Sequence, residues 1–415
     1  MRPIRALATT LLVASLAIAG CGGHPTTSIK RSTPPRVAAP TITPASAIQP
    51  RAAKWTPITP RVEGWQRLPA APISGRFMPA AVWTGRQMLV AGGTIPGAGS
   101  ARLTDGAAYN PTTRRWQRIP DAPQAARGLA STAVWTGRQM LVWAGNSPDG
   151  PAVGAIYDPA KWSWRMMATS PLGPRESYTT VWTGRELLIY GGSSGDGIAT
   201  PAAAAYNPAS DRWRLLPMAP IASRVAHAAV WSGREMLVWG GYSVVNGRIV
   251  RFGDGAAYNP RTNTWRPIAK RTPGLSLAAA WTGSRMLVWT DNRTATGATK
   301  GALYDPTRNR WTPTTAGPAM TGDLSGPVWT GSELIAWDRG STSGHVPSRG
   351  IAYNPARDTW RILPRGPLAT RHGLGRLGAA VVWTGKQALI WSGWTTAAQD
   401  APFTDGAAYR PGRTG

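Results

Sequence analysis

The chain is short of the residue types that build disulfides, metal sites and acidic surfaces. Its 415 residues include one cysteine, four histidines and 19 acidic residues. A single cysteine excludes any disulfide within the chain. The histidines show no metal-ligand spacing, so we expect neither a metal ion nor another cofactor. No stretch combines a sustained helical period with helix caps, which disfavours a helical fold.

The scarcity of acidic residues leaves a large positive charge. Lysine and arginine total 46, of which only six are lysine, and the net charge is +27. Seven basic residues and no acidic residue precede residue 61, so residues 61–415 carry a net charge of +20. This excess predicts attraction to anionic envelope material such as lipid headgroups or wall polymers. The partner that we expect is an anionic envelope polymer or a protein. A composition bias that loads arginine onto a surface without a partner is the alternative explanation.

The amino terminus reads as a targeting segment. Arg2 and Arg5 precede the apolar stretch 6–20, which is short for a spanning helix. The residues IAGC at 18–21 resemble the bacterial lipobox, which implies cleavage before Cys21 and lipidation of its sulfur. We therefore expect residues 1–20 to be a lipoprotein signal peptide and the mature protein to be held at a membrane of the bacterial cell envelope, outside the cytoplasm. An ordinary secretory signal is the alternative. Export makes a nucleic-acid partner unexpected, and no recognition motif accompanies the charge.

Residues 21–60 have a different composition from the rest. They are rich in proline, threonine and alanine and contain no acidic residue. Such a segment is typical of a flexible, partly extended tether.

Residues 61–415 are built from a repeat. The pentapeptide VWTGR at 82–86 returns, with small changes, at 134–138, 181–185, 230–234, 280–284, 328–332 and 382–386. The spacing of 47 to 54 residues suits a four-stranded blade. Each period also holds a tyrosine before a turn, as in Tyr109-Asn-Pro, and a tryptophan follows six of these tyrosines after seven residues, as Trp116 does. Five further tryptophans end the predicted second strands, where we expect them to be core: Trp143, Trp239, Trp289, Trp337 and Trp391.

These three marks together resemble the kelch repeat. The glycine pair that closes the second strand in that family is present at Gly92-Gly93, Gly191-Gly192 and Gly240-Gly241, whereas the fifth and sixth repeats lack it. The resemblance implies an all-β fold, a seven-bladed β-propeller of four-stranded antiparallel blades.

The last blade lacks its fourth strand at the carboxyl terminus. GWQRLPAAP from Gly64 resembles RWQRIPDAP from Arg115, so we expect the strand around Trp65 to complete that blade beside Tyr409. Such closure removes the open edges of the first and last blades. Trp55 is a weaker competitor for the same place.

Strand order predicts two unlike faces. The turns after the first and third strands are short and uniform, whereas the loops after the second strands vary. We expect function on the variable face.

At five blade starts there an arginine follows a proline by four residues: Arg76, Arg127, Arg175, Arg224 and Arg371. The innermost strands begin here, so we expect these side chains to ring the mouth of the central channel. They are candidates for binding carboxylate or phosphate groups, and structural pairing is the alternative. Glu176, Tyr178, His227 and His372 lie beside them and complete the candidate site.

Enzymatic functions have less support in the sequence. Copper-radical oxidases of similar fold need a cysteine cross-linked to tyrosine, and the only cysteine in this chain is at the amino terminus. The aspartate box of sialidase propellers is absent. A sugar mutarotase or epimerase would need a carboxylate and a base in the central channel, for which Glu176, Asp323 and His227 are the candidates.

The sequence thus predicts a lipid-anchored, monomeric propeller. Its first expected role is binding a protein or an anionic glycan, with no catalytic residues. A carbohydrate-processing enzyme and a structural envelope component are the alternatives.

Overall fold

The computed structural model describes residues 64–96, 101–124, 132–145, 152–194, 197–273, 276–290, 300–318, 324–338, 350–368, 376–395 and 401–412. The chain separates into two units, Met1–Pro50 and Arg51–Gly415, and all of these residues belong to the second. No α-helix is found in the described ranges, and hence none that is long and apolar enough to cross a membrane.

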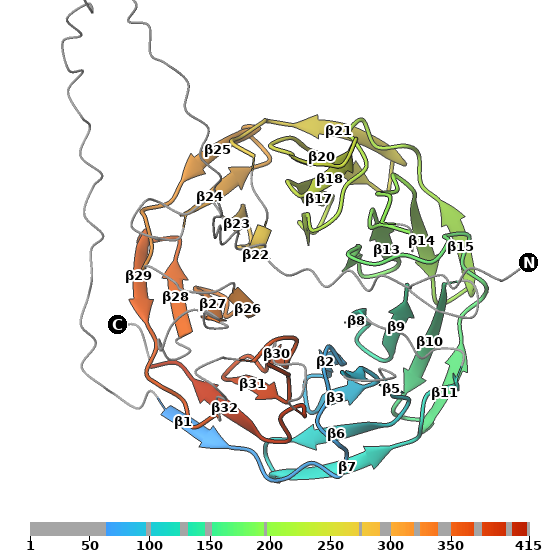
Figure 1. Ribbon diagram of the computed structural model, residues 1–415, viewed down its shortest axis with the longest axis vertical. Helices are drawn as coiled ribbons and strands as arrows, with labels where there is room; N and C mark the ends of the chain where they lie inside the picture. Colours follow the sequence, from blue (N-terminus) through green and yellow to red (C-terminus); the bar gives the residue numbers. More distant parts are fainter. Residues whose placement is uncertain are drawn as a thin grey trace, which may run out of the picture. The chain divides into compact units, whose positions relative to one another are not determined.

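The described strands form seven four-stranded antiparallel blades arranged in a ring (Figure 1). Within each blade the strands run in order from the innermost to the outermost. Blade one is β2 (Ala80–Trp83), β3 (Met88–Ala91), β6 (Gly106–Asn110) and β7 (Arg115–Ile119). Blade two is β8 (Thr132–Trp135), β9 (Met140–Ala144), β10 (Val153–Asp158) and β11 (Ser163–Met166). Blade three is β12 (Thr179–Trp182), β13 (Leu187–Tyr190), β14 (Ala203–Asn207) and β15 (Arg212–Leu215).

The remaining blades follow the same order. Blade four is β16 (Ala228–Trp231), β17 (Met236–Trp239), β20 (Gly255–Asn259) and β21 (Thr264–Ile268). Blade five is β22 (Ser276–Trp281), β23 (Met286–Thr290), β24 (Lys300–Asp305) and β25 (Arg310–Pro313). Blade six is β26 (Leu324–Trp329), β27 (Leu334–Asp338), β28 (Gly350–Asn354) and β29 (Thr359–Ile362). Blade seven is β30 (Ala380–Trp383), β31 (Ala388–Trp391), β32 (Gly406–Arg410) and β1 (Gly64–Arg67). The predicted seven-bladed propeller is therefore confirmed.

The position of a strand within its blade explains its sequence. A second strand such as β17, MLVW, is buried along its whole length, because neighbouring blades cover both of its faces. A fourth strand such as β7, RWQRI, lies at the outer edge and is largely exposed. Four of the third strands, β6, β14, β20 and β32, contain an alanine pair, as in GAAYN of β6, whose four leading residues are all buried. The apolar runs thus mark the strands sandwiched between blades.

The hydrophobic core is divided among the blade interfaces. Seven clusters of buried residues occur in the described part, and each combines residues from two adjacent blades. One of them packs Met88 and Val90 of blade one with Leu389 and Trp391 of blade seven. Blades therefore stabilise one another around the ring, as repeat units do.

The recurring TGR turn has a local cause. In the first repeat the backbone N–H of Gln87 donates to the hydroxyl of Thr84 at 2.9 Å, and Thr84 N–H donates to the Gln87 carbonyl at 2.9 Å. Gly85 between them has a φ of 90°, which a residue with a side chain adopts only at a cost. The other six repeats keep the glycine with positive φ and the hydroxyl at the same places. The pentapeptide therefore recurs because the same tight turn recurs.

The outer tryptophans tie each blade to the one before it. Trp116 pairs with Tyr109 across β6 and β7, and its indole N–H donates to the carbonyl of Pro69 at 3.0 Å. All seven blades make this contact with a carbonyl just beyond the preceding fourth strand; the donors are Trp65, Trp116, Trp164, Trp213, Trp265, Trp311 and Trp360.

Trp65 belongs to this set and completes blade seven. It pairs with Tyr409 in the register of β1 and β32, and its indole donates to the Pro364 carbonyl at 3.0 Å. Its ring lies 4.9 Å from that of Tyr409 and 6.2 Å from that of Trp337, measured between centroids. The prediction that the amino-terminal strand closes the last blade is confirmed.

Candidate functional site

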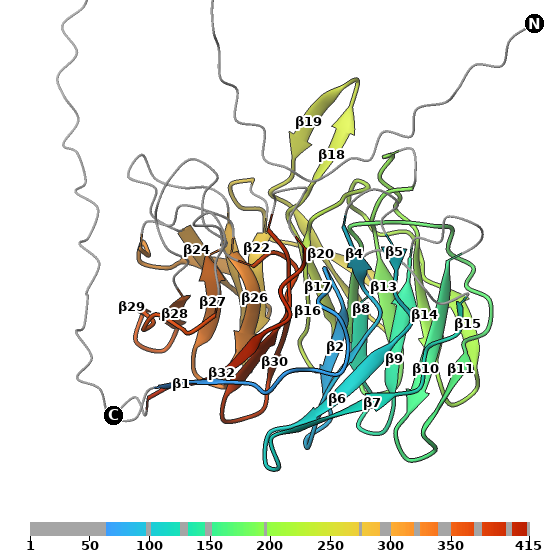
Figure 2. The same ribbon diagram turned by 60° about the horizontal axis from the view of Figure 1, so that its bottom comes forward.

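The described parts of the variable loops lie at one end of the propeller, which we call the loop face. Two of them form short hairpins between the second and third strands of their blades. They are β4 (Thr94–Ile95) with β5 (Ala101–Arg102) in blade one, and β18 (Tyr242–Val245) with β19 (Arg248–Arg251) in blade four. Figure 2 shows both at the same end of the blades, with β18 and β19 extending farthest.

Arg76 is fully buried and binds its own blade. Its Nη1 donates to the carbonyls of Gly92 and Asp105, both at 3.1 Å, and its two Nη atoms hold the Asp105 carboxylate at 2.8 and 3.1 Å. Nε donates to the Ser74 carbonyl at 3.0 Å. A guanidinium with this many charge-assisted bonds fastens the approach to the first strand onto the loop between the second and third strands.

Arg224 repeats the arrangement in blade four. Its Nη1 donates to the carbonyls of Gly240 and Asp254 at 3.0 and 3.2 Å, and Nη2 reaches the Asp254 carboxylate at 2.8 Å. Its guanidinium also stacks 4.5 Å from the ring centre of Phe252. In these two blades the structure thus provides the local pairing that was the alternative to ligand contact.

In blade seven the equivalent side chain is Arg376. Its Nη1 donates to the carbonyls of Ser392 and Asp405, each at 3.1 Å, and Nη2 bonds the Asp405 carboxylate. The candidate predicted for this blade was Arg371, which lies outside the described residues, as do Arg127, His372 and Cys21. Counting back seven residues from the recurring tryptophan finds Arg76, Arg175, Arg224 and Arg376, so that spacing was the better signal.

Arg175 in blade three differs from the other three. It is 4% exposed; Nε donates to the Gly173 carbonyl at 3.1 Å, and Nη1 donates to the carbonyls of Gly191 and Ala202 at 3.2 and 2.9 Å. Ala202 stands where blades one, four and seven have aspartate, and no carboxylate bonds Arg175 within the described ranges. Desolvation lowers the pKa of Arg175 to about 10, so it is still a cation at neutral pH.

Sequence reasoning missed the acidic partners, although a signal was present. In the three paired blades the sequences leading into the third strand read TDGAAY, GDGAAY and TDGAAY, with Asp105, Asp254 and Asp405 four residues before the tyrosine. Blade three reads PAAAAY instead. The sequence shows that blade three lacks this aspartate, but only the structure shows that Arg175 lies opposite the position.

Tyr178 and His227 make structural contacts between blades. The hydroxyl of Tyr178 donates to the Trp143 carbonyl at 2.8 Å, and burial raises the pKa of Tyr178 to about 12. Nε2 of His227 lies 2.7 Å from the hydroxyl of Thr179. Burial, reinforced by the charge of Arg224, lowers the pKa of His227 to about 3 and keeps it neutral.

Glu176 lies next to Arg175 at the start of blade three. Its backbone pairs with Ser193, with N–H to carbonyl distances of 2.8 and 2.9 Å, and its residue is half-buried.

The innermost strands give little support to a catalytic channel. The described residues of β2, β8, β12, β16, β22, β26 and β30 are alanine, valine, threonine, serine, leucine, glycine, proline and tryptophan. None of these ionises at physiological pH. Of the three residues suggested for catalysis, His227 is buried and neutral, Glu176 lies before β12, and Asp323 is outside the described residues. Within the described ranges no cluster of three His, Cys, Asp or Glu could hold a metal ion.

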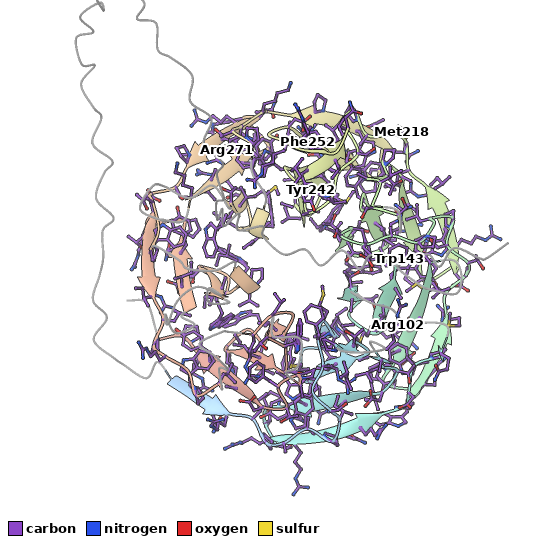
Figure 3. The ribbon with its side chains drawn as sticks, viewed as in Figure 1. Arg102, Trp143, Met218, Tyr242, Phe252 and Arg271 are labelled. Carbon is purple, nitrogen blue, oxygen red and sulfur yellow. The ribbon has the colours of Figure 1, made fainter. Side chains whose placement is uncertain are left out.

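Figure 3 places Arg102, Arg271, Tyr242 and Phe252 on this propeller with their side chains drawn. Arg271 donates through Nη2 to the Gly301 carbonyl at 3.2 Å and lies 6.0 Å from the ring centre of Trp311, and desolvation lowers its pKa. It therefore links blades four and five.

Comparison with known proteins adds no relative: the sequence matches no protein-family model and no curated protein sequence.

Proposed function

We propose that the protein is a kelch-type propeller held outside the cytoplasm by a lipid on Cys21, and that its loop face binds a carboxylate-bearing protein or glycan. The observation that carries the ligand class is Arg175. It has the backbone contacts of Arg76 and Arg224 but faces Ala202 where they face aspartate.

The position opposite Arg175 suits a carboxylate from outside the chain. In the paired blades that position is filled by Asp105 and Asp254, whose side chains are 18% and 29% exposed, so it borders solvent. An arginine held by carbonyls on one side presents the rest of its planar fork in a defined orientation, which favours carboxylate over a point charge. The net charge of +27 would attract such a ligand over a longer range.

The test converts blade three into a paired blade. Ala202→Asp supplies the missing carboxylate from within and should compete with any external one, whereas Arg175→Met removes the guanidinium. Titration calorimetry would measure how tightly the full chain carrying Cys21→Ser binds poly-L-glutamate and polygalacturonate. The affinity should fall about tenfold or more in both variants, because a charged hydrogen bond contributes roughly 1.5–3 kcal/mol.

Ala101→Asp is the matched control. It adds the same charge to the exposed strand β5 on the loop face and should change affinity only slightly. If Ala202→Asp binds both polymers as tightly as the parent, Arg175 is not the ligand contact. If only one polymer is bound, the source of the carboxylate is decided between peptide and glycan.

The anchor has a separate test. Cells expressing the chain and fed a labelled fatty acid should label the wild type and not Cys21→Ser. Label that persists in the variant would refute anchoring through Cys21, and would leave the calorimetric result unaffected.

A further inference from the structure

The hairpin of β18 and β19 stands out from the loop face (Figure 2), and four of its aliphatic side chains are exposed. Its tip is Asn246-Gly247 with φ angles of 50° and 72°, the geometry of a tight two-residue hairpin turn. Four of its aliphatic side chains are among the most exposed large hydrophobic residues described: Val244 at 53%, Val245 at 50%, Ile249 at 65% and Val250 at 41%. Exposed apolar residues gathered on one projection indicate an interaction site.

The aliphatic residues lie on both faces of the hairpin. Val244 is paired with Ile249, and residues directly opposite each other point to the same side. Val245, one residue along, points to the other side, together with Val250. A protein that covered one face would leave the other apolar face in water. A medium that surrounds the hairpin would remove both faces from water.

The charge of the hairpin selects the kind of medium. Residues 242–251 include Arg248 and Arg251 and no acidic residue. Both arginines belong to a strand that is exposed along its whole length. Guanidinium groups beside aliphatic side chains match the boundary of a bilayer, where anionic headgroups lie next to acyl chains.

The hairpin is held firmly at its base. Val225 and Tyr242 exchange backbone hydrogen bonds of 2.9 and 3.0 Å, and the Phe252 N–H donates to the Gly241 carbonyl at 2.9 Å. Phe252 in turn stacks on the buried Arg224. The projection is therefore an extension of blade four with a fixed direction.

The other hairpin on the loop face does not share this character. In β4 and β5, Thr94 is buried and Ile95 is half-buried. Among its described residues, the loop of blade three exposes a single large aliphatic residue, Ile198, whereas the β18–β19 hairpin groups four of them on one projection.

We propose that the β18–β19 hairpin inserts its tip into the interfacial region of a bilayer that contains anionic lipids. The inference rests on the proposed function in one respect, because the lipid anchor would bring the protein close to a bilayer. It does not depend on Arg175. Hairpin insertion would hold the loop face of blade four against the lipid surface.

The single cysteine makes a direct test possible. In the full chain carrying Cys21→Ser, Val245→Cys introduces the only thiol, to which an environment-sensitive fluorophore is attached. With vesicles of equal parts phosphatidylglycerol and phosphatidylcholine its emission should shift to the blue. The matched control is Leu215→Cys on β15, which is 60% exposed on an outer strand and should show no shift. The apolar segment at residues 6–20 is the same in both proteins.

Two variants identify the forces. Val244→Ser with Ile249→Ser should lower vesicle binding at the labelled position about tenfold, since each lost apolar side chain removes buried area. Arg248→Ala should lower it about fivefold on anionic vesicles, because a basic residue near such a surface contributes about 1 kcal/mol. Neither change touches the core, so the melting temperature should stay constant.

Three results would overturn the proposal. An equal shift at positions 245 and 215 would show that the vesicle contact is not made by the hairpin. An equal shift with vesicles of pure phosphatidylcholine would show that insertion does not depend on anionic headgroups. A shift at position 245 that depends on protein concentration without vesicles would assign the hairpin to contact between copies of the chain.

Discussion

Arg175 donates to the backbone carbonyl of Ala202 at 2.9 Å, the same contact that Arg76 makes with Asp105, but Ala202 brings no carboxylate. A buried guanidinium held only by carbonyls is less stabilised than one that also has an ionised partner.

Ala202→Asp should therefore raise the stability of the propeller while it weakens ligand binding. The expected gain in free energy of unfolding is about 2 kcal/mol, the contribution of a hydrogen bond to a charged group. Urea denaturation of the parent and the variant measures it. A variant that is less stable than the parent would show that blade three cannot accept the pair.

Trp162 occupies a position where blades three to six use asparagine or aspartate. Its φ is 51°, and in two other blades the residue at this place is Asn263 or Asn309, which accepts the hydroxyl of the blade's tyrosine at 2.7 Å. The hydroxyl of Tyr157 in blade two is buried without a partner among the described residues. Trp162→Asn should supply the acceptor and a residue that tolerates positive φ, and stabilise the protein by about 1 kcal/mol.

Thermal denaturation of Trp162→Asn measures this gain, with Trp162→Ala as its control. Alanine removes the indole but provides no acceptor and is strained at positive φ, so it should not stabilise. Equal melting temperatures of the two variants would argue against the hydrogen bond.

His227 should make the fold sensitive to acid. Its pKa is about 3 in the folded protein and 6.5 as an unperturbed group, so below pH 6.5 the unfolded chain binds a proton that the folded chain does not. The free energy of unfolding should fall as the pH drops from 6.5 towards 3, with a slope of up to about 1.4 kcal/mol per pH unit from this group. Denaturant titrations at several pH values should show a shallower slope for His227→Gln. Parallel curves would mean that His227 does not titrate on unfolding.

The Glu333–Arg361 ion pair should matter more than its counterpart in blade three. Its side chains are 6% and 9% exposed, whereas those of Glu186 and Arg214 are 17% and 36% exposed. Glu333→Ala should cost about 3 kcal/mol, because it removes the carboxylate that bonds a buried guanidinium. Glu186→Ala should cost about 1 kcal/mol or less. Chemical denaturation of both variants compares them.

A double variant tests the cause. Blade one has Gln87 and Gln117 at the positions of Glu333 and Arg361. Glu333→Gln with Arg361→Gln should therefore be more stable than Glu333→Ala alone. If the double variant is the less stable of the two, packing rather than charge accounts for the loss.

Trp65 should contribute to stability as a core residue despite its place near the start of the chain. Trp65→Ala removes the bond to Pro364 and the packing against Tyr409, and should cost about 3 kcal/mol. Trp55→Ala is the matched control and should change stability by less than about 0.5 kcal/mol. Comparable losses in both variants would contradict the closure by β1.

Much of the fold could be predicted because the repeat states it seven times. The TG turn needs a hydroxyl and a glycine that adopts positive φ. The tyrosine and the tryptophan of a blade meet across two neighbouring strands. Both features depend on residues that are close in sequence. Trp65 was recognisable because its strand repeats the sequence of another fourth strand. The candidate site was less predictable. Arg371 was chosen for its distance from a proline, whereas Arg376 holds the carboxylate of Asp405, because the approach to blade seven is longer than the others.

Blade number, turn chemistry and ring closure could all be inferred from the order of residues, since short-range spacing and the pairing of neighbouring strands set all three. Which arginines are neutralised depends on contacts that the fold makes. Arg76 and Asp105 lie 29 residues apart in the sequence, and the fold brings their side chains into contact. The same fold places Ala202 opposite Arg175, which therefore has no carboxylate partner among the described residues. Exposure of the β18–β19 hairpin is likewise a tertiary property. Its valines and isoleucine would suit a buried strand equally well, and they lie in solvent because no blade covers them among the described residues.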